Sequence, residues 1–181
     1  MLGLDALTIF EKQYKAVLEK TEFLAEGLEL AISAEAAGRK AYLDLAASAS
    51  FADVASFFNF LAGEELLHLK MLEGVKESLE SQGKWKPPTA GEEKQIKDQP
   101  PQFAKLLAET DGLKKNEIQS ILKAIRIERE FRDFYAGMAK KTSDVNGKRM
   151  FSALADFEQK HYDLLSGLYD STTGTSEYTM G

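Results

Sequence analysis

Apolar residues recur at helical spacing along most of the chain, and this pattern predicts an all-α fold. In residues 4–19 they lie three or four positions apart, which places their side chains on one face of a helix. The same pattern predicts longer helices at about 24–47, 51–79, 115–141 and 145–169. Thr21 is a suitable N-cap for the first of these longer helices.

The connections between the predicted helices differ in length. Short breaks at 48–50 and at 142–147 indicate that each pair of flanking helices forms an antiparallel hairpin. Residues 82–114 hold all four prolines and no helical stripe, apart from a short helix expected at 102–109. A connector of about 30 residues can return along a bundle roughly 40 Å long. We therefore expect a four-helix bundle in which a long crossover joins two hairpins.

The expected organisation is one domain preceded by an added helix. Residues 1–20 form an N-terminal amphipathic helix, residues 21–170 form the bundle, and residues 171–181 form a disordered tail. A chain of 181 residues can bury a substantial core as one domain. The N-terminal helix is expected either to pack against its own bundle or to mediate dimerisation, and a homodimer is the expected assembly.

Composition and charge exclude several classes of function. A net charge of −6 argues against nucleic-acid binding, which needs a basic face. The absence of cysteine excludes disulfides, thiolate-bound zinc and iron–sulfur clusters. The N-terminal segment lacks the apolar core of a signal peptide, and no window is apolar over about 18 residues, so no membrane span is expected. We expect a cytoplasmic protein.

The two predicted hairpins repeat each other when the chain is shifted by 93 residues, the separation of Glu35 and Glu128. Each half carries E-x3-R-x2-Y on its first helix and L-A-x2-E-x2-H on its second. The equivalent polar pairs are Glu35 and Glu128, Arg39 and Arg132, Tyr42 and Tyr135, Glu65 and Glu158, and His68 and His161. These pairs include the only two histidines of the chain.

The spacing within the repeat predicts a site for two metal ions. A glutamate and a histidine three positions apart lie on one helix face and can bind the same ion. The preceding helix adds a glutamate, so each half offers three ligands. The six expected ligands are Glu35, Glu65, His68, Glu128, Glu158 and His161. Four carboxylates and two imidazoles suit iron, manganese or zinc, and two divalent ions balance the four negative charges.

This pattern allows two other interpretations. A single E-x2-H on a helix is usually a solvated glutamate beside a core or surface histidine, as in a helical interaction module without metal. A repeated E-x2-H in register is poorly explained by chance. Glu64 is a rival to Glu65 as a ligand, but the position equivalent to Glu64 in the second half holds Phe157, so the repeat favours Glu65.

The repeated tyrosines and arginines also have two interpretations each. Tyr42 and Tyr135 lie two turns after the first glutamate of each half, where they can hydrogen-bond a ligand carboxylate or act as redox-active phenols near the metals. They are equally well explained as core aromatics with satisfied hydroxyl groups. Arg39 and Arg132 can add positive charge near the site, but ordinary helix-surface arginines are the simpler interpretation.

Over about residues 24–170, these motifs resemble the ferritin-like superfamily, and within it the rubrerythrin-like di-iron carboxylate proteins. The resemblance rests on the six expected ligands together with the two tyrosines. It implies a ferritin-like four-helix bundle with two iron ions as the cofactor. By this resemblance Glu65 and Glu158 bridge the two irons, Glu35 and Glu128 are terminal carboxylates, and His68 and His161 each bind one iron.

Three features depart from the rubrerythrin pattern. Phe131 lies one turn after Glu128, where rubrerythrins have an additional glutamate, and His161 stands where they have a final glutamate. Without cysteine, the sequence has no ligands for the rubredoxin module that delivers electrons in rubrerythrin proper. The symmetric ligand set is more similar to that of bacterioferritin.

The resemblance implies a di-iron oxidoreductase in which bound Fe(II) reacts with peroxide or dioxygen. An external electron donor of unknown identity is then a further partner. Two alternatives stay open on the same site: a non-catalytic iron-binding or storage protein, and a hydroxylase that acts on an organic substrate such as a quinone.

Overall fold

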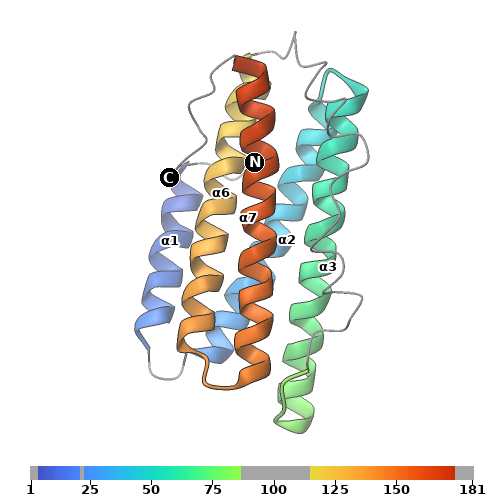
Figure 1. The fold of residues 1–181 in the computed structure, drawn as a ribbon. Helices are drawn as coiled ribbons and strands as arrows, with labels where there is room; N and C mark the ends of the chain where they lie inside the picture. The colour runs from blue at the N-terminus through green and yellow to red at the C-terminus, as the bar shows by residue number, and fades with distance from the viewer. Residues whose placement is uncertain (1–3, 21–22, 87–114, 174–181) are drawn as a thin grey trace.

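The computed structural model describes residues 4–20, 23–86 and 115–173, and these residues form helices and short connections without strands (Figure 1). The helices are α1 (Leu4–Glu19), α2 (Leu24–Ser48), α3 (Ala52–Gln82), α6 (Lys115–Lys141) and α7 (Val145–Thr173). The expected all-α architecture is therefore confirmed. No helix in these ranges is both long enough and apolar enough to cross a membrane.

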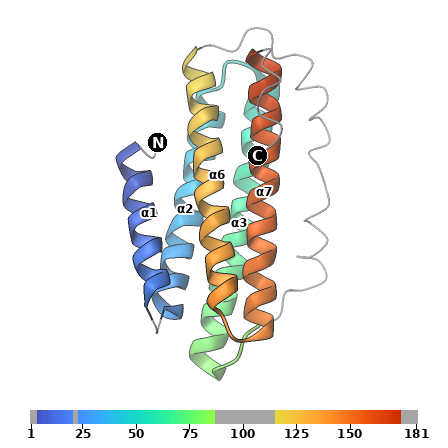
Figure 2. The ribbon, with the colours of Figure 1, turned by 60° about the vertical axis from the view of Figure 1, so that its left-hand side comes forward.

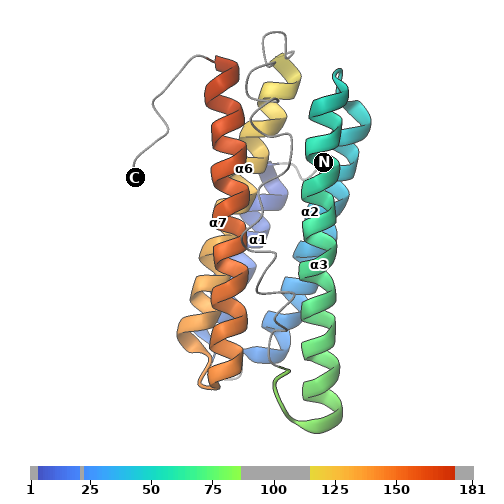
Figure 3. The same ribbon diagram turned by 45° about the vertical axis from the view of Figure 1, so that its right-hand side comes forward.

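The four long helices form two antiparallel hairpins that lie side by side (Figures 1 and 3). Helices α2 and α3 make extensive contacts with each other, as do α6 and α7, whereas contacts between the hairpins are fewer. This arrangement agrees with the ferritin-like bundle that the resemblance implies. The expected crossover falls mainly on residues 87–114, which lie outside the described residues, as do Thr21 and the short helix expected at 102–109.

Local sequence explains where two of the helices begin and end. Gly83 ends α3 in the left-handed conformation, with a φ of 63°, which glycine adopts without steric strain. Asp144 precedes α7, and its carboxylate accepts hydrogen bonds from the backbone N–H groups of Asn146 (2.8 Å) and Gly147 (3.1 Å). These bonds satisfy two donors that the first turn of the helix leaves without intrahelical partners.

Helix α7 is longer than the sequence pattern indicates, because it includes residues 171–173, which that pattern assigns to the disordered tail. The hydroxyl groups of Ser171 and Thr172 both donate to the backbone carbonyl of Leu168. Small polar residues can therefore satisfy their side chains within the helix instead of ending it. The rest of the expected tail, residues 174–181, lies outside the described residues.

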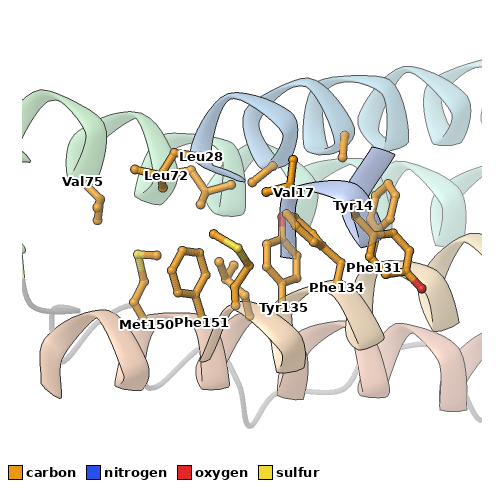
Figure 4. Packing of buried hydrophobic residues seen from close by; sticks show 14 of the residues in the cluster. Tyr14, Val17, Leu28, Leu72, Val75, Phe131, Phe134, Tyr135, Met150 and Phe151 are labelled. Carbon is orange, nitrogen blue, oxygen red and sulfur yellow. The ribbon is translucent and has the colours of Figure 1, made fainter. Parts of the chain in front are cut away.

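The core of the bundle consists of two apolar clusters, one toward each end. Figure 4 shows the first cluster, which includes Leu72, Phe131, Phe134, Tyr135 and Phe151. The second cluster includes Phe58, Leu61, Ile121, Leu165 and Leu168. Burial of these side chains removes apolar surface from water, which is the main driving force for folding. The repeated glutamates and histidines lie where the two clusters meet.

Helix α1 packs across α2 and α6 (Figure 2). The rings of Phe10 and Phe131 lie 5.0 Å apart, centroid to centroid. The hydroxyl of Tyr14 donates a hydrogen bond to Glu130 over 3.1 Å. Of the two roles expected for this helix, packing against its own bundle is therefore observed.

Trp85 anchors the chain where it leaves α3. Its ring lies edge-on to that of Phe151, with the centroids 5.7 Å apart. Gly147 at the start of α7 leaves room for the indole, because a Cβ atom there would lie only 2.7 Å from the Trp85 ring and 2.5 Å from Cγ2 of Thr142. This contact ties the end of the first hairpin to the turn of the second.

Candidate metal centre

Six acidic and histidine side chains converge in the middle of the bundle, and none is more than 2% exposed. They come from all four long helices: Glu35 from α2, Glu65 and His68 from α3, Glu128 from α6, and Glu158 and His161 from α7. The structure thus brings together all six residues that the repeat identifies. Their donor atoms form two groups of four, and within each group all of the atoms lie within 4.8 Å of one another.

The first group surrounds Nδ1 of His68. This nitrogen lies 3.3 Å from Oε2 of Glu35, 3.3 Å from Oε2 of Glu65 and 3.3 Å from Oε1 of Glu158. Helical spacing explains only the contact with Glu65, which lies one turn earlier on α3. The other two carboxylates are supplied by the packing of α2 and α7 against α3.

The second group surrounds Nδ1 of His161 in the same manner. This nitrogen lies 3.3 Å from Oε1 of Glu65, 3.6 Å from Oε2 of Glu128 and 3.5 Å from Oε2 of Glu158. Glu65 and Glu158 therefore turn one oxygen toward each histidine. Glu128 belongs only to this second group, and Glu35 belongs only to the first. The site has the two-fold pattern of the sequence repeat.

The atoms that face the centre of the site are well suited to binding cations. They are Oε2 of Glu35 and Glu128, both carboxylate oxygens of Glu65 and Glu158, and Nδ1 of His68 and His161. All eight are buried, and none has a hydrogen-bond partner among the residues that the structure describes. Buried polar atoms are normally hydrogen-bonded, and those that are not require an explanation such as a bound ion. Six oxygens and two nitrogens match the ligand preference of iron, manganese or zinc.

The two repeated tyrosines each donate a hydrogen bond to the opposite hairpin. The Tyr42 hydroxyl on α2 donates to Oε1 of Glu128 on α6, and the Tyr135 hydroxyl on α6 donates to Oε1 of Glu35 on α2. Each bond takes the outer oxygen of a carboxylate and leaves Oε2 directed at the site. Tyr42 and Tyr135 therefore make the hydrogen bonds to carboxylates of the site that were one interpretation of the sequence.

Burial and repulsion between acids raise the pKa values of the two outer carboxylates. The pKa of Glu35 is raised well above its ordinary value by burial and then by Glu65 and Glu158. The pKa of Glu128 is raised well above its ordinary value by burial and then by Glu158. Burial also favours the neutral forms of Glu65 and Glu158, but their contacts with the two histidines contribute to a lowered pKa for both.

The surrounding acids favour the charged form of both histidines. Burial on its own lowers the pKa of both imidazoles, but carboxylates, chiefly Glu35 for His68 and Glu128 for His161, raise these pKa values well above the ordinary one. Without a metal, the raised pKa values of the two imidazoles and of the two outer carboxylates all favour binding of protons at the site. Protons and cations thus compete for the same negative charge.

The other candidates lie outside the two groups of donor atoms. Glu64 is half-buried, and burial raises its pKa. Arg132 donates to Gln159 over 2.8 Å and to Asp133, which is the behaviour of a helix-surface arginine. Arg39 is half-buried on α2. The structure thus separates Glu64 from Glu65, in agreement with the register of the repeat.

Two further residues lie beside the site. Phe131, which the resemblance to rubrerythrins places at the position of their additional glutamate, is only 2% exposed, and its ring lies 5.0 Å from that of Phe10 on α1. Gly38 on α2 faces Glu65, since a Cβ atom on Gly38 would lie 3.8 Å from the carboxylate carbon of Glu65. Sequence reasoning did not identify Gly38. Its one signal is that glycine lowers the stability of a helix interior, so a glycine within a long helical pattern usually has a packing or functional reason.

The fold and the paired carboxylate–histidine groups define a ferritin-like protein with a candidate dinuclear carboxylate site. The family model named Rubrerythrin matches residues 26–169, which is most of the chain. The protein therefore belongs to the rubrerythrin family, in agreement with the di-iron class that its ligand pattern resembles. Comparisons with curated proteins and with solved structures found no match.

Proposed function

We propose that this protein is a non-haem di-iron oxidoreductase whose two ferrous ions are oxidised by hydrogen peroxide or by dioxygen. The observation that carries the proposal is the convergence of eight unpartnered donor atoms in the buried core. Membership of the rubrerythrin family supports iron over manganese or zinc as the metal. Such a reaction would place the protein in the cytoplasmic defence against oxidative stress.

The distances suggest a role for each proposed ligand. Glu65 and Glu158 would be shared by both ions, because each directs one oxygen to each histidine. Glu35 and His68 would hold one ion from its outer side, and Glu128 and His161 would hold the other. Two divalent ions cancel the charge of four carboxylates, which relieves the cost of burying like charges together.

When bound, two ferrous ions supply two electrons, which with two protons reduce hydrogen peroxide to two molecules of water or dioxygen to hydrogen peroxide. An external electron donor must return those electrons for the next turnover. The apolar clusters on both sides keep bulk water from the reacting centre, and the ring of Phe157 lies 4.6 Å from that of His68.

Tyr42 and Tyr135 keep the terminal carboxylates oriented during this reaction. Burial, together with Glu128 for Tyr42 and Glu35 for Tyr135, raises the pKa of each phenol well above its ordinary value. Both phenols therefore stay protonated at neutral pH and continue to donate. Hydrogen bonds of this kind fix the direction of a ligand and tune its affinity for the metal.

The ligand set also suggests how the cycle differs from that of rubrerythrin proper. The rubrerythrin-type cycle moves iron between ligands, and Phe131 stands here at the position of the additional glutamate of rubrerythrins. Phe131 is a buried aromatic with no donor for iron. We propose that each ion keeps the same ligands in both oxidation states.

The test loads the full chain with two equivalents of Fe(II) without oxygen and mixes it with peroxide or with dioxygen in a stopped-flow spectrometer. Oxidation of both ions by at least one oxidant is expected. A chain with Glu65→Ala and Glu158→Ala is the control, since it should not load iron. Failure of the loaded protein to react with either oxidant would contradict the proposal.

The size of the assembly distinguishes this function from iron storage. Storage requires a hollow shell that can enclose many iron atoms per chain, whereas the homodimer that we propose cannot enclose a mineral. Light scattering combined with iron quantitation is therefore expected to give a dimer with about two irons per chain, the number set by one dinuclear site. A large assembly that retains many irons per chain would favour storage.

A further inference from the structure

An apolar cleft lies between α2 and α6 on the outer side of the metal site. These two helices run next to each other in Figure 2. The buried walls of the cleft are formed by Gly38, Tyr42, Ala124 and Ile127. More exposed residues, Asp44 and Lys123 among them, form its mouth. The cleft has a cavity volume of about 30 Å³, and its lining is mostly carbon.

The cleft occupies the part of the α2–α6 face that α1 leaves uncovered. Helix α1 packs on residues near Phe131 and Met138 of α6 and near Gly27 of α2. The cleft residues lie after this region in α2, at 38–45, and before it in α6, at 120–127. Among the residues that the structure describes, α1 thus covers one half of this side of the bundle and leaves the other half open to a small apolar guest.

Two residues of the cleft also contact the metal site. Tyr42 donates its hydrogen bond to Glu128. Gly38 lies next to Glu65, because a Cβ atom on Gly38 would be 3.8 Å from the carboxylate carbon of Glu65 and 3.4 Å from the ring of Phe131. Because Gly38 has no side chain, the inner end of the cleft reaches toward Glu65, a proposed bridging ligand.

Close packing does not explain why residue 38 is glycine. A Cβ atom on Gly27 would lie 2.3 Å from the Met138 side chain, and one on Gly137 would lie 2.5 Å from Leu18, so helix packing accounts for both of those glycines. On Gly38 the nearest atoms would be at 3.4 to 3.9 Å, which is ordinary contact. Alanine fits there and would stabilise the interior of α2 by about 1 kcal/mol. The missing methyl group therefore suggests that open space at this point has a function.

We propose that the cleft is the route by which dioxygen reaches the metal site, with Gly38 as its inner opening. The proposal rests on the proposed di-iron function and identifies dioxygen as an oxidant of that site. Dioxygen is a small apolar molecule, and apolar cavities in proteins stay dry and accept guests such as xenon. Peroxide loses hydrogen bonds to water on entering such walls, so the cleft favours dioxygen over peroxide.

The first test compares Gly38→Ala with Gly63→Ala. Gly63 is the matched control, because it is an exposed glycine within α3 whose Cβ would contact nothing within 4 Å. Both variants are loaded with Fe(II), and the bound iron is counted before mixing. Gly38→Ala is expected to slow oxidation by dioxygen about tenfold, equivalent to a barrier about 1.4 kcal/mol higher. Its oxidation by peroxide, and both reactions of Gly63→Ala, are expected to stay near the wild-type rates.

The second test needs no metal and no turnover. Crystals of the full chain are pressurised with xenon, and an anomalous-scattering peak is expected between α2 and α6, beside Tyr42 and Ala124. Ala41→Leu fills the cleft from a half-buried wall position. This variant is expected to lose the xenon peak and to slow oxidation by dioxygen, whereas Gly63→Ala keeps both.

The outcomes separate this inference from the proposed function. A wild-type dioxygen rate in Gly38→Ala, or equal slowing with both oxidants, would overturn the role of the cleft while leaving the di-iron function intact. Absence of xenon from the wild-type cleft would overturn it as well. Failure of the iron-loaded protein to react with either oxidant would instead overturn the proposed function, and with it the role assigned to dioxygen here.

Discussion

The hydroxyl of Tyr42 on α2 hydrogen-bonds the carboxylate of Glu128 on α6, so a residue of one hairpin orients a proposed ligand of the other. Tyr135 and Glu35 make the same contact in the opposite direction. The two hairpins are thus joined at their buried centre by a symmetric pair of bonds that also belong to the metal site. The contacts that join the two hairpins therefore also orient proposed ligands of the site.

Tyr42→Phe is expected to weaken metal binding without unfolding the chain. The substitution keeps the ring in its core position but leaves Oε1 of Glu128 buried without its donor, and loss of such a bond typically lowers metal affinity by about 10- to 100-fold. Competition with a chelator would measure the change. Tyr162→Phe is the control, because Tyr162 is half-buried on α7 and contacts Arg132. Unchanged affinity in Tyr42→Phe would contradict the role assigned to this bond.

Metal binding is expected to release protons and to weaken as the pH falls. The pKa values of Glu35 and Glu128 are raised by burial and neighbouring acids, and those of His68 and His161 are raised by the facing carboxylates. A metal must displace these protons, so lower pH favours the metal-free form. Calorimetry in buffers of different ionisation enthalpy should show net proton release at neutral pH. Binding without proton release would contradict this description of the metal-free site.

Metal is also expected to stabilise the fold, because only the folded chain brings the six residues together. A ligand present at 100 times its Kd adds about 2.7 kcal/mol to the free energy of unfolding. For a chain of this size that corresponds to a rise in Tm of about 5–10 °C. Thermal unfolding with and without a divalent metal would measure it. The double variant Glu65→Ala, Glu158→Ala should show no rise, and a metal-independent Tm in the unaltered chain would contradict the site.

Gly147→Ala is expected to destabilise the protein by about 1–3 kcal/mol, the usual penalty for overpacking. The added methyl group would lie 2.7 Å from the rigid ring of Trp85, so the anchor of the chain after α3 must move. Urea unfolding would measure the free energy of unfolding of this variant and of Gly63→Ala, which is the matched control because a Cβ on Gly63 would contact nothing within 4 Å. Gly63→Ala should gain stability by up to about 1 kcal/mol, since alanine is the better helix former. Equal stability of the two variants would contradict a tight contact at Trp85.

The helices and the two hairpins could be predicted because their signals are local. Apolar spacing defines a helix within its own residues, and short polar breaks define a hairpin. The six residues of the site could also be predicted, because the repeat pairs each of the three expected ligands of one half with an identical residue in the other. No structural knowledge was needed to prefer Glu65 over Glu64.

The contacts between the hairpins could not be predicted, because they depend on tertiary packing. The sequence places Tyr42 on the same helix face as Glu35, yet its partner is Glu128, which lies 86 positions later in the chain. The position of Gly38 in the cleft could not be predicted either, because the cleft forms only where α6 packs beside α2. The sequence pattern ends α7 too early, because Ser171 and its neighbours have a loop-like composition but form hydrogen bonds within the helix.

The central claim is that the buried glutamates and histidines bind two metal ions, and an anomalous-scattering map tests it most directly. Crystals of the full chain grown with Fe(II) in the absence of oxygen are measured at the iron edge, together with metal quantitation in solution. Two peaks are expected, one within bonding distance of His68 and the other of His161, both bridged by Glu65 and Glu158. A map without metal near either histidine would contradict the claim.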